Sequence, residues 1–424
     1  MTERLLQFIW QMQYFNKADL RTTCNEPLQV IYPGQFNTNQ GPDFREASLK
    51  INTTTWVGNI ELHVKASDWK LHRHGEDKNY RNIILHVVWE NDDPVHDERG
   101  NEMPALVLED KVSILLLQRY EALMLAQTVI PCSSSLAVVP ELVWSSWKAR
   151  LVAERLERKT HIVGEYLKET NGHWEEVFWW MLARNFGIAV NSDAFEAVAR
   201  SLPVKTLAKH KHQIQHLESF LMGQAGLLNA DFKEDYPRML QKEYRFYRKK
   251  YNFLPVYEPV HFLRMRPGSF PTVKLAQLAK LIQQSSRLFG KIKAASRLHQ
   301  VKNMLAVTAN DYWHYHYRFD EVSAFKEKAL GRQMTDNVII NTVIPVLFAY
   351  GYLNQEQSYK SRALQWLEAT APEQNSIARQ WAALGVIHSS AYDSQACIEL
   401  TKAYCHNKNC LNCAAGAAIL KRSV

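Results

Sequence analysis

The spacing of hydrophobic residues in the first 110 positions changes from that of a helix to that of strands. An opening helix over residues 3–15 is indicated by apolar residues spaced i, i+3, i+4, i+7, namely Leu5, Phe8, Ile9 and Met12. Short alternating or apolar runs separated by turn residues then predict strands at 28–32, 46–51, 54–65, 82–90 and 104–108. Gly58-Asn59 interrupts the longest run, which is typical of a bulge or bend. Ser67 is placed to cap a short helix that ends near Gly75.

From about residue 139 onward the spacing is helical almost to the end of the chain. Helices are predicted at 141–167, 174–185, 192–201, 206–221, 272–288, 292–304 and 337–349. Prolines and serines gather near 131–140, and further prolines punctuate 255–271, so boundaries are expected in both places. The predicted fold class is therefore α+β. A domain of helix, three strands, helix and strand (1–135) precedes two helical domains (136–255 and 256–424).

The composition is that of an ordinary soluble protein, with 46% hydrophobic and 22% charged residues in 424. The apolar stretch 338–349 is too short to cross a bilayer, so we expect no membrane association. The first ten residues lack the layout of a signal peptide. Six cysteines do not make a disulfide scaffold, so we expect a cytoplasmic, reducing location.

The net charge of +8 is concentrated in one tract. Residues 238–302 hold 15 Lys and Arg against two acids, whereas the rest of the chain holds 36 bases and 41 acids. Such a tract favours a polyanionic partner, and nucleic acid is the expected one. The alternative is a set of solvated helix faces.

The most informative polar residues lie between 41 and 90. The predicted strand 54–65 contains Glu61, His63 and Lys65, and a period of two places all three on one face. Asp43, at the start of the preceding strand, can meet that face. Ionisable groups on a central strand are costly unless they are paired or hold a metal. A metal site and a buried ladder of ion pairs both satisfy this requirement.

This arrangement resembles the PD-(D/E)xK nuclease superfamily, whose core has the same order of helices and strands. The family's Pro-Asp pair falls on Pro42-Asp43 and its acid on Glu61. The family's Lys falls on His63, which departs from the motif, and Lys65 is the nearest substitute. The whole chain also resembles an uncharacterised bacterial family that combines Gly-Pro-Asp-Phe, Glu-x-His, Ser-Asp-Trp and a Cys-rich tail.

The superfamily resemblance implies hydrolysis of phosphodiester bonds. Asp43 and Glu61 would bind Mg²⁺ or Mn²⁺, and His63 or Lys65 would orient the attacking water or stabilise developing charge. His72 and His86 lie close in the sequence and are further candidates, with His74 a weaker one. A group of histidines and acids also suits zinc, although no His-Glu-x-x-His motif is present.

Four of the six cysteines fall in the last 28 residues, as Cys397, Cys405, Cys410 and Cys413. The Cys-x2-Cys pair has the spacing with which two thiolates reach one metal from a turn. These four cysteines predict a structural zinc site or an iron–sulfur cluster, in which His406 could replace one cysteine ligand. The alternative is four thiols that bind no metal. Cys24 and Cys132 are isolated in the sequence and are expected to be packing residues.

The basic tract contains the predicted nucleic-acid contacts. Arg245, Arg248 and Lys249 share one helix face, and Tyr244, Tyr247 and Tyr251 are spaced to alternate with them. Two more arginines, Arg264 and Arg266, precede a predicted helix whose N-terminus is suited to a phosphate.

The sequence thus favours a metal-dependent nuclease, or a degenerate one, joined to helices that bind nucleic acid. A non-catalytic scaffold that binds nucleic acid or protein is the second hypothesis. A zinc hydrolase built on the histidines is the third.

Overall fold

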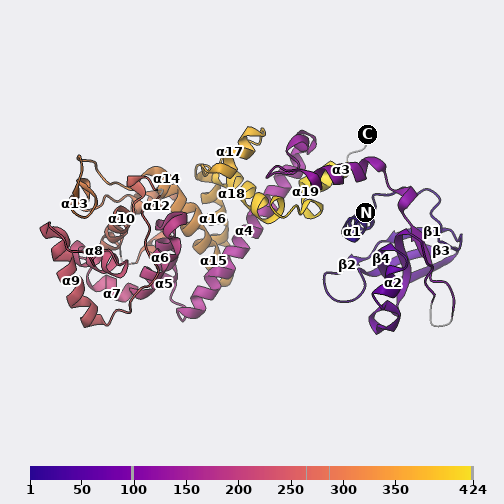
Figure 1. Cartoon of the computed structure of the whole chain (residues 1–424), viewed down its shortest axis with the longest axis horizontal. Helices are drawn as coiled ribbons and strands as arrows, with labels where there is room; N and C mark the ends of the chain where they lie inside the picture. The colour runs from indigo at the N-terminus through magenta and orange to yellow at the C-terminus, as the bar shows by residue number, and fades with distance from the viewer. Residues whose placement is uncertain (97–99, 264, 286, 422–424) are drawn as a thin grey trace. The chain divides into compact units, whose positions relative to one another are not determined.

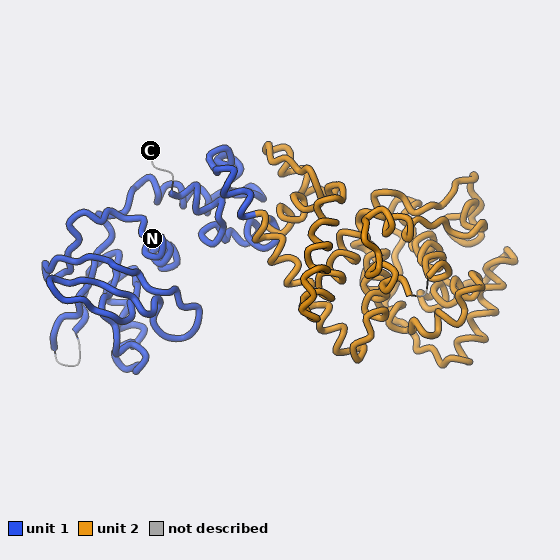
Figure 2. The backbone as a smooth tube through the Cα atoms, turned by 180° about the vertical axis from the view of Figure 1, so that it is seen from behind, with its two compact units in different colours: residues 1–147, 401–424 blue, residues 148–400 orange. Residues whose placement is uncertain are grey.

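The computed structural model describes residues 1–96, 100–263, 265–285 and 287–421. It divides into two compact units, shown in Figure 2. Unit 1 combines residues 1–147 with 401–424, and unit 2 is residues 148–400. The predicted boundaries near 135 and 255 differ from this division. The C-terminal residues belong with the N-terminal ones, which the sequence does not indicate.

Unit 1 contains a mixed sheet, which confirms the α+β prediction. Its elements are α1 (Glu3–Met12), β1 (Leu28–Tyr32), β2 (Gln35–Phe36), β3 (Phe44–Ile51), β4 (Thr54–Lys65), α2 (Asp68–Leu71), β5 (Ile83–Glu90) and β6 (Ala105–Val107). The strand order is β1-β3-β4-β5-β6, with β2 paired to β3. The pair β3–β4 is antiparallel, whereas β4–β5 and β5–β6 are parallel. The sheet therefore places β4 between β3 and β5, as predicted.

The opening helix forms because its apolar stripe is buried against this sheet. Thr2 caps α1, since its Oγ1 accepts a hydrogen bond from the Leu5 N–H. Leu5 and Ile9 are buried, and α1 packs against β4. The helix ends at Met12, and Gln13 adopts a left-handed conformation there. Met12 is exposed, so the predicted stripe is one residue shorter than its spacing suggested.

The predicted irregularity at Gly58-Asn59 is present. The β4–β5 register shifts between Asn59 and Ile60, and the β3–β4 register shifts nearby, between Phe44 and Ala47. A Cβ at Gly58 would lie 2.5 Å from Ile84 Cγ2 on β5. Glycine is therefore required because the two strands approach closely at this point.

The segment after β4 differs from the prediction. Ser67 is at the N-cap of α2, but its hydroxyl donates to Asp92 Oδ2 (2.7 Å) and makes no capping bond. The helix ends at Leu71, well before Gly75, and two 3₁₀ turns follow it, η1 (His74–Glu76) and η2 (Lys78–Tyr80). Since α2 packs against β4, the turns that follow it can reach the polar residues of that strand.

The remainder of unit 1 is helical. It contains α3 (Ile114–Leu125), η4 (Ser133–Val138), the start of α4 (Glu141–Glu169), η8 (Cys410–Asn412) and α19 (Ala414–Lys421). α19 packs against α3 and η4, as Figure 1 also shows for α3. Segments from the two ends of the sequence thus share one core.

Unit 2 is formed by helices and one short hairpin. Its elements beyond α4 are α5 (Trp174–Phe186), α6 (Ile188–Ser201), α7 (Val204–Lys209), α8 (Ile214–Gln224), α9 (Asp235–Tyr251), η5 (Pro267–Ser269), α10 (Pro271–Gln284), α11 (Leu288–Ala294), α12 (Leu298–Leu305), α13 (Asp311–His314), β7 (His316–Arg318), β8 (Glu321–Val322), α14 (Arg332–Val338), η6 (Ile339–Val343), α15 (Ile344–Leu353), α16 (Gln357–Ala369), α17 (Ser376–Ala383) and α18 (Ala391–Glu399). The π-helical segment η7 (Leu400–Cys405) follows α18. The mostly helical second half is as predicted.

One continuous helical run, Arg332–Leu353, is long and apolar enough to span a membrane by length and composition. Of its most apolar window, 61% is buried inside the protein. That burial is typical of a core helix, which passes the same test of length and composition.

Candidate metal centre

The central strand β4 carries two buried polar side chains, Glu61 and His63, on one face. The parallel register with β5 places His86 beside Glu61. His86 is also buried, and its Nε2 lies 2.8 Å from Nδ1 of His63. Two neighbouring strands therefore hold one carboxylate and two imidazoles in the interior of unit 1.

Asp43 meets this face from the start of β3, as the sequence predicts. Its backbone N–H donates to Glu61 Oε2 (3.0 Å). Its own carboxylate oxygens are both bonded, Oδ2 to the Leu62 N–H (3.1 Å) and Oδ1 to the Gln7 side-chain amide of α1 (2.8 Å). Asp43 therefore joins α1, β3 and β4, and it fixes the orientation of Glu61.

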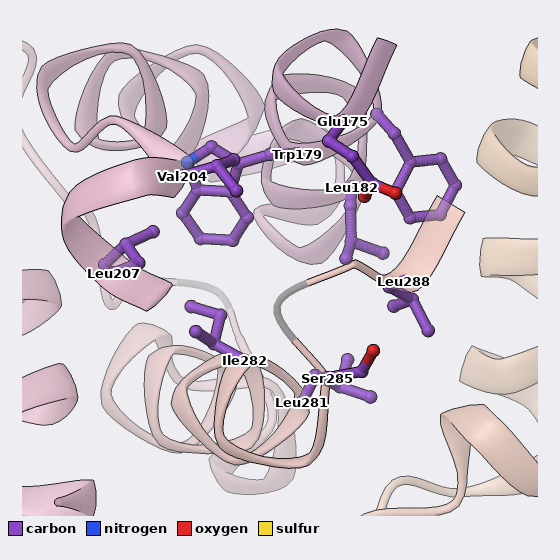
Figure 3. Close-up of a pocket in the computed structure, with 10 residues that line it drawn as sticks. Glu175, Trp179, Leu182, Val204, Leu207, Leu281, Ile282, Ser285 and Leu288 are labelled. Atoms are coloured by element: carbon purple, nitrogen blue, oxygen red, sulfur yellow. The ribbon is translucent and has the colours of Figure 1, made fainter. Parts of the chain in front are cut away.

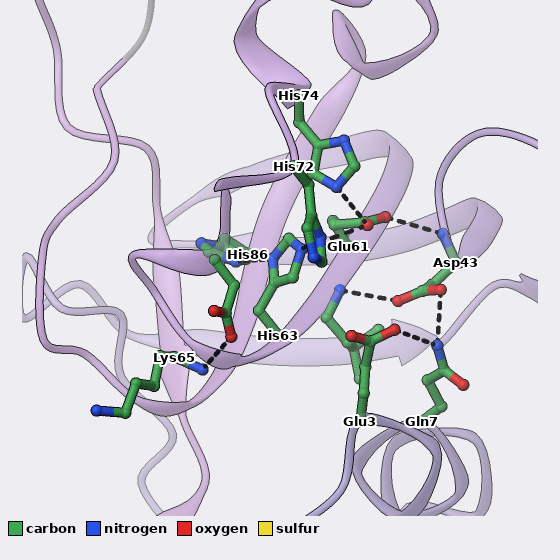
Figure 4. Close-up of polar contacts among 11 residues, drawn as sticks. Glu3, Gln7, Asp43, Glu61, His63, Lys65, His72, His74 and His86 are labelled. Atoms are coloured by element: carbon green, nitrogen blue, oxygen red, sulfur yellow. Dashed lines mark hydrogen bonds and ion pairs between the residues drawn. The ribbon is translucent and has the colours of Figure 1, made fainter. Parts of the chain in front are cut away.

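Two more histidines reach Glu61 and His63 from the turns after α2 (Figure 4). His72 Nδ1 lies 3.2 Å from His63 Nε2. His74 Nε2 lies 3.3 Å from Glu61 Oε1, and the same oxygen is 3.8 Å from His63 Nε2. One ligand atom from each of His63, His72 and His74, here called the histidine triad, lies within 4.8 Å of the other two.

These separations are those of ligands around one transition-metal ion. Four atoms bound tetrahedrally to zinc at about 2.0–2.1 Å are about 3.3–3.4 Å apart. The His63–His72 distance matches that value, and all three ligand atoms of the histidine triad lie within 4.8 Å of one another. Glu61 Oε1 lies beside the triad, 3.3 Å from His74 Nε2 and 3.8 Å from His63 Nε2. His74 Nε2 is buried and makes no hydrogen bond of good geometry; it contacts Glu61 Oε1 at 3.3 Å. The residues present therefore fit a bound metal ion.

Among the described residues, no Lys or Arg forms an ion pair with Asp43 or Glu61. Burial, followed by the charge of Glu3, raises the pKa of Asp43 to about 7. Burial, followed by the charge of Asp43, raises the pKa of Glu61 to about 9. A divalent cation at the histidine triad would supply the missing positive charge.

Three of the imidazoles, those of His63, His74 and His86, are held in the neutral form, which is the form that binds metals. Burial and then the charges of His86, His74 and His72 lower the pKa of His63 to about 2. Burial is also the first cause for His74 and for His86, whose pKa values are each lowered to about 4. The Tyr80 ring stacks on His74 with centroids 3.9 Å apart. His72 is exposed, so the triad is open to solvent on one side.

Lys65 does not join the site. Its Nζ lies 3.8 Å from Glu90 Oε2, and both side chains are half-exposed. Figure 4 shows Lys65 turned away from Asp43 and Glu61. The alternative to a metal site, an ion-pair ladder of Lys65 with Asp43 or Glu61, is therefore not formed, and Lys65 is not placed to orient a water at the triad.

The C-terminal cysteines are divided between the units. Cys405, Cys410 and Cys413 are buried in unit 1, whereas Cys397 is buried on α18 of unit 2. His406 is exposed. Among the described residues, the histidine triad is the one group of three or more ligand atoms within 4.8 Å of one another. The four cysteines of the sequence prediction do not gather around a single zinc-sized centre.

The basic residues of α9 are at the surface. Arg245, Arg248 and Lys249 are exposed, as is Arg266, whereas Arg264 lies outside the described residues. Lys274 of the same tract is buried, and burial lowers its pKa to about 8. The tract therefore offers fewer surface charges than its sequence suggests.

The tyrosines of α9 do not alternate with these bases on the surface. Tyr244 is buried and donates to Gln224 Oε1 (2.6 Å). Tyr247 packs on His210, with ring centroids 4.8 Å apart, and the hydroxyl of Tyr251 is 2.8 Å from His210 Nε2. The rings hold α9 against α8 and the turn before it; Tyr244 is buried, and Tyr247 and Tyr251 are only partly exposed.

The predicted phosphate site after Arg266 is not formed. The first residues of α10, Pro271 and Thr272, are buried, and the Thr272 hydroxyl donates to the Tyr317 carbonyl (2.5 Å). A phosphate cannot approach this helix N-terminus from solvent.

A small apolar pocket in unit 2 offers little chemistry. It has a volume of about 30 Å³, and Figure 3 shows its lining, which is mainly aliphatic and aromatic. The one carboxylate there, that of Glu175, accepts the N–H groups of Phe289 (3.1 Å) and Gly290 (2.7 Å) at the start of α11. Glu175 is thereby used as a helix cap.

Sequence reasoning undervalued His74 and missed Gln7 and Tyr80. The signal for His74 was its position two residues after His72, in a turn that returns to β4. Gln7 offered no signal, because its contact with Asp43 depends on how α1 packs on the sheet.

Comparison with known proteins gives one family. The family model described as "Protein of unknown function (DUF2851)" matches residues 3–376. No curated protein and no solved structure matches the chain.

Proposed function

The chain belongs to the DUF2851 family, and from this premise we propose that unit 1 is a metal-dependent hydrolase that cleaves phosphodiester bonds in nucleic acid. The observation that carries the proposal is the convergence of one nitrogen atom from each of His63, His72 and His74 within 4.8 Å of one another, with Glu61 Oε1 beside two of them. Imidazole ligands suit zinc and related transition metals better than Mg²⁺, which prefers oxygen. The proposed metal is therefore Zn²⁺ or Mn²⁺.

The histidine triad would hold the ion, and the ion would activate a bound water and polarise the phosphoryl group. Glu61 Oε1 lies beside the triad, where it can accept the proton of that water. Asp43 positions Glu61 through its backbone N–H, and its own carboxylate oxygens already accept two hydrogen bonds. His86 supports His63 from the side opposite the metal, as outer partners of ligand histidines commonly do.

The choice of substrate rests on two supports. The element order and the Pro42-Asp43 and Glu61 positions resemble the PD-(D/E)xK nucleases. Exposed bases on α9 offer contacts for a polyanion. His63 in place of the superfamily's Lys fits a site that uses an imidazole as a metal ligand.

The test uses the full chain, two site variants and a matched control. His72→Ala should lose the bound metal with little effect on folding, because His72 is exposed. Glu61→Gln should keep the metal and lower cleavage by at least ~100-fold, the usual contribution of a general base. His161→Ala removes an exposed histidine of α4 and should change neither quantity.

Metal content would be measured by elemental analysis, and cleavage on labelled single-stranded and duplex DNA and RNA. Retention of the metal by His72→Ala, or equal cleavage by wild type and Glu61→Gln, would contradict the proposal.

A zinc hydrolase that acts on other bonds is the second candidate, and the imidazole ligands favour it. Activity on an activated carboxylic ester, without cleavage of nucleic acid, would support this candidate. Binding of nucleic acid without hydrolysis of either substrate would instead identify a non-catalytic scaffold.

A further inference from the structure

Unit 1 is assembled from two stretches of the chain that are separated by all of unit 2, as Figure 2 shows. The C-terminal stretch supplies three buried cysteines, Cys405, Cys410 and Cys413. His406, next to the first of them, is exposed. Three thiols thus face the interior from a segment of nine residues.

A fourth buried cysteine comes from the N-terminal stretch. Cys132 directly precedes η4, and η4 packs against α19, the helix that begins one residue after Cys413. Burial raises the pKa of Cys132 to about 12, and the next causes are the charges of Cys413 and Cys410. Cys132 therefore lies where η4 packs against α19, and Cys413 directly precedes that helix. No sequence pattern indicates this proximity, because Cys132 is isolated along the chain.

Cys397 has different surroundings. It lies on α18 in unit 2, where burial raises the pKa of its thiol to about 12 and the charges that act on it are those of Lys148 and Asp393. It is therefore a poor candidate for the fourth ligand, although its sequence position suggested it.

The three C-terminal cysteines lie in two consecutive turns of the backbone. The Cys405 carbonyl accepts the Lys408 N–H (3.0 Å), and the Cys410 carbonyl accepts the Cys413 N–H (3.3 Å). A Cβ at Gly416 would lie 2.2 Å from the Cys410 carbonyl oxygen, so only glycine allows α19 to begin so close to the turn. Burial raises the pKa of Cys413, whereas the backbone N–H groups of Gly416 and Ala415 and the Trp147 side chain act to lower it. Such donors stabilise a thiolate, which is the metal-binding form.

We infer that Cys132, Cys405, Cys410 and Cys413 bind one iron–sulfur cluster, which fastens the C-terminal stretch of unit 1 to its N-terminal stretch. This centre uses none of the residues of the histidine triad, so it goes beyond the proposed hydrolase and does not depend on it.

The spacing of the sulfur atoms favours a cluster over zinc. Thiolates on one zinc ion at about 2.3 Å are about 3.8 Å apart. Among the described residues no three cysteine sulfurs lie within 4.8 Å of one another. In an iron–sulfur cluster the cysteine thiolates bind iron atoms of a core that is larger than a single ion. The cysteine sulfur atoms are therefore further apart than they are around one zinc ion.

The position of the cluster gives it a structural purpose. Cys132 and Cys405 lie on either side of unit 2 in the sequence, so a centre that binds both closes a very long loop. Bringing such distant segments together costs conformational entropy, which opposes assembly of unit 1. Binding of one cluster by both segments offsets that cost.

The first experiment measures iron and acid-labile sulfide in the full chain purified without oxygen, together with the visible absorption spectrum. Wild type should contain both, and Cys132→Ser should lose most of the iron. Cys397→Ser and Cys24→Ser are the matched controls and should retain it, as should His72→Ala. Folding of each variant would be checked by circular dichroism.

The second experiment needs no variant, so a misfolded Cys132→Ser would not leave the inference untested. Wild type would be alkylated before and after removal of iron by a chelator, and each thiol would be quantified by mass spectrometry. Labelling of Cys132, Cys405, Cys410 and Cys413 should rise together, while that of Cys397 stays constant. The inference is overturned by protein without iron, by stoichiometric zinc in its place, by loss of iron in Cys397→Ser, or by constant labelling of Cys132.

Discussion

A carboxyl group without a charged partner lies in the interior of unit 2. Glu218 on α8 is fully buried, and its Oε2 accepts hydrogen bonds from Tyr236 (2.7 Å) and Trp313 (2.9 Å). Its Oε1 is buried without a hydrogen-bond partner. Burial raises the pKa of Glu218 from 4.5 to about 7, although both hydrogen bonds lower it. The folded protein therefore favours the protonated acid.

This raised pKa predicts a pH dependence of stability. The unfolded state releases the proton near pH 4.5 and the folded state near pH 7, so unit 2 should lose stability as pH rises through this window. The loss from this residue should be on the order of 3 kcal/mol, since one pKa unit corresponds to about 1.4 kcal/mol. Denaturant unfolding at pH 5, 6, 7 and 8 would measure it.

Glu218→Gln is the matching control, because its amide has similar size and cannot ionise. The variant should show a flatter pH dependence than wild type over the same window. Identical slopes for the two proteins would mean that Glu218 does not titrate in this range.

At the level of elements, the pairing of β4 with β5 positions the candidate site. Gly58 lies where β4 has no space for a side chain beside β5, and the β4–β5 register after the shift that follows it pairs Glu61 with His86. A different register would move the polar face of β4 relative to β5 and separate His63 from His86.

Gly58→Ala should therefore destabilise unit 1 by about 1–3 kcal/mol, the usual cost of overpacking. The added Cβ would meet Ile84 Cγ2 at 2.5 Å and the Asn82 carbonyl oxygen at 2.8 Å. Thermal unfolding, together with metal content, would test whether strand separation also disturbs the histidine triad.

Gly164→Ala is the control for this substitution. Gly164 lies inside α4, and a methyl group added there would have open space within 4 Å, so alanine should leave stability unchanged or raise it by up to about 1 kcal/mol. A loss of stability at Gly164 as large as that at Gly58 would remove the strand-packing explanation.

At the level of the whole molecule, the exposed bases of α9 predict salt-dependent binding to nucleic acid. Replacing Arg245, Arg248 and Lys249 with Glu should weaken binding strongly, because each base would release counterions from the nucleic acid on contact. On duplex DNA the log–log slope of affinity against salt should become shallower by about 0.9 for each phosphate that the variant no longer neutralises. Fluorescence anisotropy at several salt concentrations would measure both quantities.

A control triple variant separates this effect from net charge. Lys17, Arg332 and Arg379 are exposed bases outside the tract, and their replacement with Glu changes the charge equally. Equal loss of affinity in both triple variants would indicate attraction by overall charge and no localised site.

The local pattern of the sequence predicted the opening helix and the main strands of unit 1, but not β2 or α3. Period-two alternation in 54–65 correctly predicted a strand with Glu61 and His63 on one face, and the helical spacing of 3–15 predicted α1. These features follow from backbone geometry within a few residues, which a single sequence displays directly. The contact between Asp43 and Glu61 was predictable because the two residues lie on strands that follow one another in the sequence and pair in the sheet.

Only the tertiary structure decided which polar residues meet. The approach of His72 and His74 to Glu61 depends on turns after α2, and the proximity of Cys132 to the C-terminal cysteines depends on packing between distant segments. Burial of Tyr244 and exposure of Arg245 likewise depend on which side of α9 packs against α8. Such contacts are set by the summed free energy of packing over a whole unit, and no local pattern of residues contains that sum.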